Sequence, residues 1–268
     1  MIDGVVELGE HLGQSDKPFD IYFADLEGAL DITVGNFEQL ANGGSIVGNA
    51  DLVDDSEVKA VIENDGDSTE GFDDSDGSLV MSGVEKLTIV QIKGTNETAT
   101  IRLGDTVEDL ETLAFRGNYN DTLIVEDAAW GMAVELQGGS RAAADGPTGT
   151  ANVGKIDLTF EQPGADAVVN LTHSLAGDTR TIKAYGIEIN NADSITVNAG
   201  ASSAVIDSIT GDDVTELDFT SDANVTIGTA LDADQLSNVD ASGVSGNFAA
   251  TVSGSADTDG FVFNAADG

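Results

Sequence analysis

Residues 194–259 fall into three rows of 22: SITVNAGASSAVIDSITGDDVT (194–215), ELDFTSDANVTIGTALDADQLS (216–237) and NVDASGVSGNFAATVSGSADTD (238–259). Apolar residues recur in the same columns of these rows. The second column holds Ile195, Leu217 and Val239, the fourth holds Val197, Phe219 and Ala241, and the twelfth holds Val205, Ile227 and Ala249. The following segment GFVFN (260–264) opens a fourth row, which predicts that Phe261 and Phe263 extend the second and fourth columns.

A row with two strand segments and two turns is typical of one coil of a parallel β-solenoid. Stacked coils place identical columns above one another, and alternate residues of a strand face the core and the solvent. We therefore predict an all-β parallel β-helix or β-solenoid with about 22 residues per coil. The alternative is a set of antiparallel β-sandwich domains, whose strands recur every 8–12 residues.

Upstream of residue 194 the repeat is less regular. Val134 and Leu136 recur 22 residues later as Ile156 and Leu158, but other strand-like segments are spaced unevenly. Two stretches break the pattern, because they are rich in acidic or small residues. We predict an N-terminal cap or assembly segment (1–29), an irregular solenoid (30–193) with an acidic insertion (51–78) and a loop (137–150), and regular rows (194–268).

The chain is strongly acidic and has no cysteine. Its 268 residues include 49 Asp and Glu against 10 Lys and Arg, a formal net charge of −39. Such a chain has no basic patch to neutralise phosphates, which excludes nucleic acid as a partner. No segment is apolar over the length that membrane insertion needs. The start MIDGVVELGEHLG lacks the basic and apolar regions of a signal peptide, so export would use another route.

Clusters of Asp and Asn in turns are candidate calcium ligands, because Ca²⁺ prefers six to eight oxygen atoms from carboxylates and carbonyls. The alternative is a solvated acidic face of a salt-adapted protein. None of the clusters fits an EF-hand loop. The candidates are Asp212, Asp213, Asp234, Asp257 and Asp259 in the stacked turns of the rows, Asp73, Asp74 and Asp76 in the acidic insertion, and Asn118, Asn120 and Asp121.

Catalysis has little support in the sequence. His11 and His173 are the only histidines, and neither stands in a recognisable Ser/His/Asp or metal-ligand spacing. Carboxylates are abundant everywhere, so their presence alone indicates no acid–base pair. We therefore predict that the chain is not an enzyme and has no catalytic or organic-cofactor residues.

Two segments resemble secreted bacterial surface proteins of the RTX type. GSADTDGFVFNAADG (254–268) is similar to an RTX segment that ends in aromatic residues, and LSNVDASGVSGNFAATVSGS (236–255) is similar to rows of RTX-type S-layer proteins. RGNYNDTLIV (116–125) resembles the RTX nonapeptide, although Arg116 and Tyr119 replace two of its glycines. The resemblance implies an extracellular, calcium-associated, secreted surface protein, without the β-roll that needs those glycines.

Together these observations favour a structural role. We expect an extracellular protein that self-assembles into an S-layer, sheath or filament with Ca²⁺ support, and whose partner is another copy of itself. A cell-surface polysaccharide is a further candidate partner. Two alternatives remain: a calcium-dependent adhesin or binding module of a longer RTX-type protein, and a carbohydrate-active β-helix enzyme.

Overall fold

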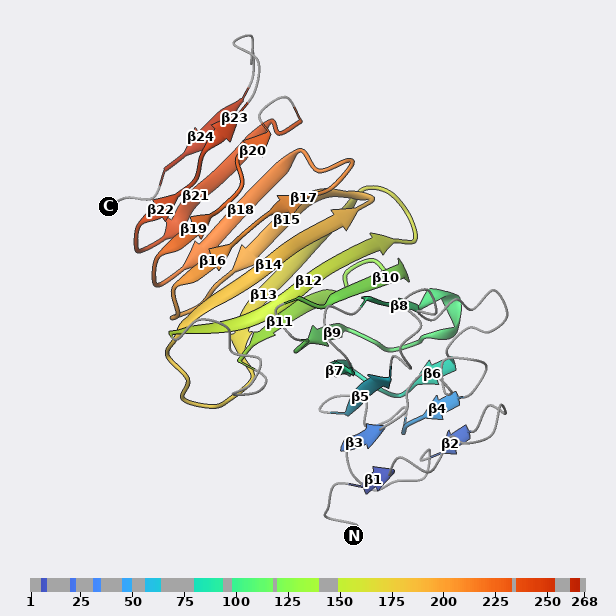
Figure 1. Cartoon of the computed structure of the whole chain (residues 1–268). Coiled ribbons are helices and arrows are strands. Elements are labelled where there is room, and N and C mark those ends of the chain that lie inside the picture. The colour runs from blue at the N-terminus through green and yellow to red at the C-terminus, as the bar shows by residue number, and fades with distance from the viewer. Residues whose placement is uncertain are drawn as a thin grey trace.

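The computed structural model of the chain describes residues 6–8, 20–22, 31–34, 45–49, 56–63, 80–93, 98–117, 120–139, 149–232, 235–253 and 261–265. Its strands stack into a rod that runs from the N-terminal to the C-terminal strands (Figure 1). Every pairing between described strands is parallel. The protein is therefore a parallel β-solenoid, and the antiparallel sandwich is excluded.

One sheet, the long sheet, runs through the whole rod and has 11 strands. Nearly every coil contributes one of its strands. They are β1 (Val6–Leu8), β3 (Asp31–Val34), β5 (Glu57–Glu63), β7 (Lys86–Lys93), β9 (Thr112–Phe115), β11 (Ala133–Gly138), β13 (Ala165–His173), β15 (Ala192–Asn198), β18 (Glu216–Ser221), β21 (Asn238–Val244) and β24 (Val262–Asn264).

Three smaller sheets complete the coils. The second sheet contains β8 (Thr98–Arg102), β10 (Thr122–Ala128), β12 (Thr150–Phe160), β14 (Thr181–Asn190), β16 (Ala204–Ile206), β19 (Val225–Ile227) and β22 (Phe248–Ala249), with β17 (Ile209–Thr210) beside β14. The N-terminal sheet contains β2 (Asp20–Tyr22), β4 (Ser45–Val47) and β6 (Val80–Ser82). β20 (Leu231–Asp232) pairs with β23 (Val252–Ser253), and a 3-10 turn covers Gly104–Thr106.

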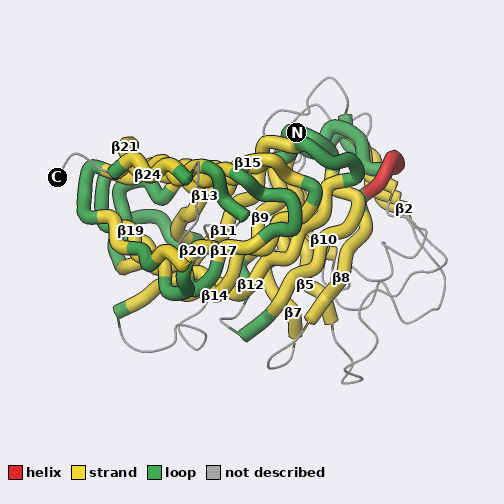
Figure 2. The backbone as a smooth tube through the Cα atoms, turned by 90° about the horizontal axis from the view of Figure 1, so that it is seen from above, coloured by secondary structure: helices red, strands yellow, loops and turns green. Residues whose placement is uncertain are grey.

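The core lies between the long sheet and the sheets that face it. In Figure 2 the long-sheet strands β13, β15, β21 and β24 run along one side, and β12, β14 and β19 run along the other. Strand residues alternate between buried and more exposed positions. In β13, Ala165, Ala167, Val169 and Leu171 are buried, whereas Asp166 is exposed and Val168 and Asn170 are half-buried. The core consists mainly of Val, Ile, Leu and Ala, with Phe115, Phe160 and Phe219 as its largest fully buried side chains.

The 22-residue rows are confirmed in the long sheet. Ile195 pairs with Leu217, and Leu217 pairs with Val239. All three are buried. The predicted fourth member of the stack is wrong, because Val239 pairs with Phe263 rather than with Phe261. The last coil is two residues longer than the coils before it. The residue that stacks on Val239 is therefore Phe263, two positions after the one that the 22-residue period predicts.

The twelfth column is also wrong. Val205 pairs with Thr226, and Thr226 pairs with Ala249, so these three residues share one outward column. The buried neighbour of Ile227 is Ile206. The reason is that the second sheet repeats at 21 and then 23 residues while the long sheet repeats at 22. The turns between the two sheets differ in length from coil to coil, and they account for the difference between these spacings.

Upstream, coil length varies widely. Val134 and Ile156 belong to opposite sheets, so their 22-residue spacing does not reflect stacking. The steps along one core column are 26 residues from Val6 to Ile32 and from Ile32 to Val58, 29 from Val58 to Leu87, 26 from Leu87 to Leu113, 21 from Leu113 to Val134, 35 from Val134 to Val169 and 28 from Val169 to Val197.

Parts of the predicted acidic insertion and of the predicted loop belong to strands of the solenoid. β5 lies within the expected acidic insertion 51–78 and is a strand of the long sheet between β3 and β7, so this part of the prediction is wrong. Its alternation of Val58 and Ala60 with charged Glu57 and Lys59 explains the strand. In the expected loop 137–150, Gln137 and Gly138 still belong to β11, and Thr150 begins β12. In the segment 1–29, the described residues form β1 and β2, which begin the long and N-terminal sheets.

Corners between strands use backbone conformations that turn the chain sharply. Asn191, between β14 and β15, has a φ of 63°. Its side-chain Nδ2 donates to the carbonyl of Phe160, one coil below, at 2.8 Å. Asn tolerates this left-handed conformation better than other residues with a side chain. None of the described elements is a helix of a length and hydrophobicity that could cross a membrane.

Candidate functional site

At the C-terminal end of the rod, the last described strand of the long sheet has no partner among the described strands on its outer side, and it carries apolar side chains. β24 pairs with β21 on one side, and it is the last strand of the long sheet. Val262 is 50% exposed and Phe263 is 43% exposed. An unpaired edge of this kind presents N–H and C=O groups that can pair with a further strand. The end therefore offers both backbone hydrogen bonds and apolar surface to a partner.

An aromatic series leads from the core to this end. The Phe219 ring is fully buried, and its centroid lies 4.9 Å from that of Phe248. Phe248 is half-buried and lies 6.0 Å from Phe263. Tilted rings at these separations interact favourably beyond their buried area. The core thus continues to β24, where Phe263 is still 43% exposed among the described residues and could be covered by a further coil.

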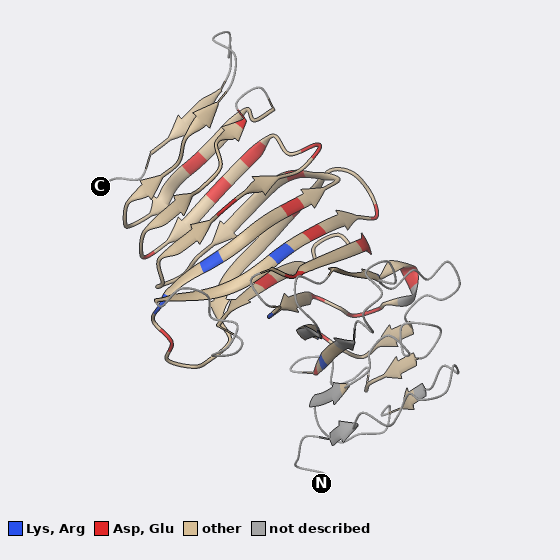
Figure 3. Cartoon of the chain, in the orientation of Figure 1, with Lys and Arg blue, Asp and Glu red and all other residues tan. Residues whose placement is uncertain are grey.

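The same end has no positive charge of its own. Lys183 is the last basic residue in the sequence, and residues 184–268 contain 14 Asp and Glu. Figure 3 shows acidic residues on successive strands of this part of the rod. The basic residues of the ion pairs Lys155–Glu188 and Lys183–Asp207 lie on β12 and β14 instead. Any contact made through the C-terminal end has to overcome like-charge repulsion.

Two of these carboxylates lie directly above one another on the outer face of the long sheet. Asp218 of β18 pairs in register with Asp240 of β21, and Asp240 pairs with Asn264 of β24. Burial and the nearby charge of Asp240 raise the pKa of Asp218. Hydrogen bonds from Ser242, and a further one from Asn264, lower the pKa of Asp240. The outer column therefore presents oxygen ligands on three successive strands.

We expect Asp218→Asn to stabilise the apo protein at pH 7. A carboxyl group with a raised pKa in the folded chain binds its proton more tightly there. Its ionisation therefore costs stability as the pH rises from the ordinary value of 3.8 through the folded value. Like charges directly opposite each other cost about 0.2–1 kcal/mol, so a gain of that size in the free energy of unfolding is expected. Urea unfolding in a chelating buffer measures it.

The gain should disappear at pH 3, where Asp218 is protonated in both states. The exposed Asp193→Asn is the matched control, since it removes the same charge from an exposed position of the neighbouring strand β15. A loss of stability in Asp218→Asn at pH 7, with the chelator present, would contradict the repulsive pairing.

A second acidic group lies on the second sheet. Asp157 of β12 pairs in register with Glu188 of β14. The Asn190 Nδ2 lies 3.5 Å from Asp157, and the backbone N–H of Asp212 donates to Asn190 Oδ1 at 3.2 Å. Burial, followed by the charges of Glu188 and Asp212, raises the pKa of Asp157 against the lowering effect of Lys155. Unlike the column on the long sheet, this group contains its own cation.

The predicted metal ligands are only partly brought together. Asp212 and Asp213 are adjacent and exposed in the turn before β18. Asn120 is exposed, whereas Asp121 is 1% exposed and its backbone oxygen accepts the Lys155 N–H. Among the described residues, no three His, Cys, Asp or Glu side chains form a group that could hold a metal ion. The other candidates lie outside the described residues: Asp73, Asp74, Asp76, Asn118, Asp234, Asp257 and Asp259.

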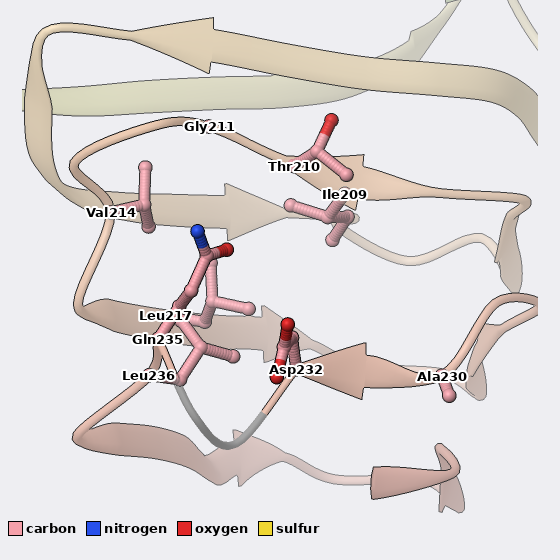
Figure 4. Close-up of a pocket in the computed structure, with 9 residues that line it drawn as sticks. All are labelled: Ile209, Thr210, Gly211, Val214, Leu217, Ala230, Asp232, Gln235 and Leu236. Atoms are coloured by element: carbon pink, nitrogen blue, oxygen red, sulfur yellow. The ribbon is translucent and has the colours of Figure 1, made fainter. Parts of the chain in front are cut away.

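A small cavity lies between β17, β18 and β20 (Figure 4). Its volume is about 60 Å³, and its lining includes Ile209, Val214, Leu217 and Leu236, with Asp232 as its one charged residue. Binding pockets for small molecules hold roughly 300–1,000 Å³. The cavity has room for a few water molecules and is too small for a sugar or an organic cofactor.

The sequence reasoning missed the carboxylates of the outer columns. Asp218 and Asp240 are 22 residues apart and occupy the third column of the rows, between the two apolar columns that defined the repeat. The alternation of a strand places such a column outside. Asp157 and Glu188 are 31 residues apart, and no fixed period in the sequence points to their pairing.

Comparisons of the chain with models of protein families, with curated proteins and with solved structures gave no match.

Proposed function

We propose that the protein is an extracellular structural subunit that assembles end to end into a filament, sheath or surface layer, with Ca²⁺ between the subunits. The observation that carries this proposal is the unpaired strand β24 with its exposed Val262 and Phe263. The resemblance to RTX-type surface proteins supports the extracellular location and the metal.

The topology favours stacking of one copy on another. The long sheet has β24 at one edge and β1 at the other, and all its pairings are parallel. A second copy that adds its β1 edge to β24 therefore continues the same parallel sheet. Such a contact joins two different surfaces, and because each copy is added along the rod axis, repeating it generates a linear assembly rather than a ring. Strand addition supplies the backbone hydrogen bonds, and burial of Phe263 supplies apolar contact.

Calcium has a specific task in this arrangement. The C-terminal part has no Lys or Arg after Lys183, so the chain itself cannot neutralise its carboxylates there. Asp218, Asp240 and Asn264 supply only hard oxygen ligands, which suit Ca²⁺. Three side chains provide fewer oxygens than the six to eight that Ca²⁺ takes. Ligands from a neighbouring copy would complete the set and join the two subunits.

We expect Phe263→Asp to abolish end-to-end assembly. The substitution places a charge at the open end of the core column, above Val239, and removes the aromatic side chain that a second copy would cover. Sedimentation velocity and negative-stain electron microscopy in millimolar Ca²⁺ should show rods or layers for the wild type and single subunits for the variant.

Trp130→Asp is the matched control, because Trp130 is an exposed aromatic residue, 57% accessible, in a turn on the side of the rod. Its assembly should equal that of the wild type. Loss of assembly in Trp130→Asp alone would move the contact to the side of the rod and reject the end-to-end arrangement.

A further inference from the structure

A cluster of polar side chains, largely shielded from solvent, lies at the end of the long-sheet strands β13 and β15, where two successive coils lead into the second sheet. His173 is the last residue of β13, and Asp178 lies in the loop between β13 and β14. Ser202 lies in the next coil, in the turn between β15 and β16. The side chains of His173 and Asp178 are only 11% and 9% exposed. These residues are distant from the assembly end and take no part in the function proposed above.

The three side chains form a series. The Ser202 Oγ lies 2.9 Å from His173 Nε2. The opposite ring nitrogen, His173 Nδ1, lies 3.6 Å from Asp178 Oδ2. A nucleophile within hydrogen-bond reach of a base, which a carboxylate in turn orients, is the arrangement of acyl-transfer sites. We propose that Ser202, His173 and Asp178 form a catalytic triad that hydrolyses neutral carboxylic esters.

The hydrogen bonds around the ring give His173 its role. When the Ser202 hydroxyl donates to Nε2, the neutral imidazole carries its proton on Nδ1, facing Asp178. Nδ1 is buried and has no hydrogen-bond partner within 3.5 Å. A buried orphan donor beside a carboxylate is rare in folded proteins. The contact is slightly longer than a hydrogen bond, as often found at catalytic sites without substrate.

Asp178 is held firmly in place. Its carboxylate accepts the backbone N–H of Arg180 at 3.0 Å and Arg180 Nη2 at 2.6 Å. These hydrogen bonds hold the pKa of Asp178 well below its usual range, so the carboxylate stays ionised. Gly139 packs against the pair, and a Cβ at Gly139 would lie 2.8 Å from Arg180 Nη2. Asp178 can therefore orient the imidazole and stabilise its protonated form without taking the proton itself.

The backbone around Ser202 is also fixed. The carbonyl of Ser203 accepts the N–H of Ile182 at 2.9 Å, and the carbonyl of Gly200 accepts the N–H of Asp222 at 2.8 Å. The amide of Ser202 closes the turn over Gly200 and Ala201, whereas the amide of Ser203 donates to no acceptor within the described part of the chain. The Ser203 amide is therefore the candidate donor to the oxyanion that forms when Ser202 attacks a carbonyl carbon.

The proposed reaction has two balanced steps. The Ser202 Oγ attacks the ester carbonyl while His173 Nε2 takes the hydroxyl proton, and the alcohol leaves with that proton, giving an acyl-serine. Water then attacks the acyl group, His173 takes one of its protons and returns it to Ser202 Oγ, and a carboxylic acid leaves. A net charge of −39 repels anionic substrates, so the substrate class is a neutral ester.

The test uses a fluorophosphonate probe and p-nitrophenyl acetate on the purified full chain. We expect the probe to label Ser202, and the acetate to give a burst of p-nitrophenol. Ser202→Ala should abolish both. His173→Gln should slow labelling at least about 100-fold, the usual contribution of a general base, and Asp178→Asn about tenfold or more. Cleavage before Asp193 and Asp207 yields a fragment in which tandem mass spectrometry distinguishes Ser202 from Ser194 and Ser203.

Ser194→Ala is the control, because Ser194 Oγ donates to Asp166 at 2.7 Å and no histidine is involved. Its labelling should match the wild type. Circular dichroism verifies the fold of each variant, and a urea-unfolded wild type should lose the reactivity, which keeps the test valid if His173→Gln does not fold. No label on Ser202 in the folded wild type, or equal labelling in a folded His173→Gln, would show a purely structural hydrogen bond and overturn the proposal.

Discussion

Phe219→Ala is expected to lower the free energy of unfolding by about 3–5 kcal/mol, the range for deleting a large buried side chain. Phe219 is 1% exposed, and it lies on Val197 of the coil below. Its ring also contacts Phe248 across the core. The neighbouring strands are fixed by their ladders, so they cannot move together to fill the space. Urea unfolding followed by circular dichroism, in a chelating buffer that prevents assembly, measures the loss.

Phe263→Ala serves as the control for this prediction. The same side chain is removed, but Phe263 is 43% exposed in the single subunit. Its loss should cost less than about half as much as the loss of Phe219, since only part of its surface is buried. A change below about 1 kcal/mol in Phe219→Ala would show that the column is not part of the core.

Millimolar Ca²⁺ is expected to induce assembly that KCl at the same ionic strength does not. Monovalent salt only screens the repulsion between subunits, with a Debye length near 8 Å at about 0.15 M. A bound divalent cation attracts carboxylates from both sides. Light scattering should therefore rise with Ca²⁺ and return to its starting value after chelation. An equal response to the two salts would leave only screening of an acidic surface and end the calcium proposal.

Variants locate the cation within this experiment. The double change Asp218→Asn with Asp240→Asn should raise the Ca²⁺ concentration needed for assembly at least several-fold. Asp105→Asn with Glu108→Gln removes two exposed carboxylates from the opposite half of the rod and should have little effect. A third variant changes the four predicted turn ligands to Asn: Asp212, Asp213, Asp234 and Asp257. A shift in that variant alone would place the bridge in the turns.

The sequence predicts the fold wherever coil length is constant. Ile195, Leu217 and Val239 could be stacked because 22 residues separate each from the next. Phe263 could not be placed above Val239, because two additional residues in the last coil leave no mark in the apolar pattern. Upstream, coils of 21 to 35 residues carry different turns, so equal spacing in the sequence no longer means equal position in the rod.

The sites were harder to predict than the core for the same reason. Asp218 and Asp240 follow the period and could have been found by reading the columns between the apolar ones. His173 and Ser202 are 29 residues apart, and they meet only because the coil at that level has a particular length. The number of residues between two side chains that meet across successive coils depends on the length of the turns between them. These turn lengths vary from coil to coil, so the sequence does not predict which side chains meet.

The stacking of coils also bears on how the chain folds. Strands that pair in the long sheet are 21 to 35 residues apart in a chain of 268, so the relative contact order is about 0.1, close to that of helical bundles rather than of most β-proteins. Each coil can add to the one before it, as in other solenoids. Folding can therefore start in the long, well-buried strands β12 to β15 and spread both ways, so that β24 docks last and opens first. A strand that opens first in one subunit is also the strand most readily exchanged for that of a neighbour.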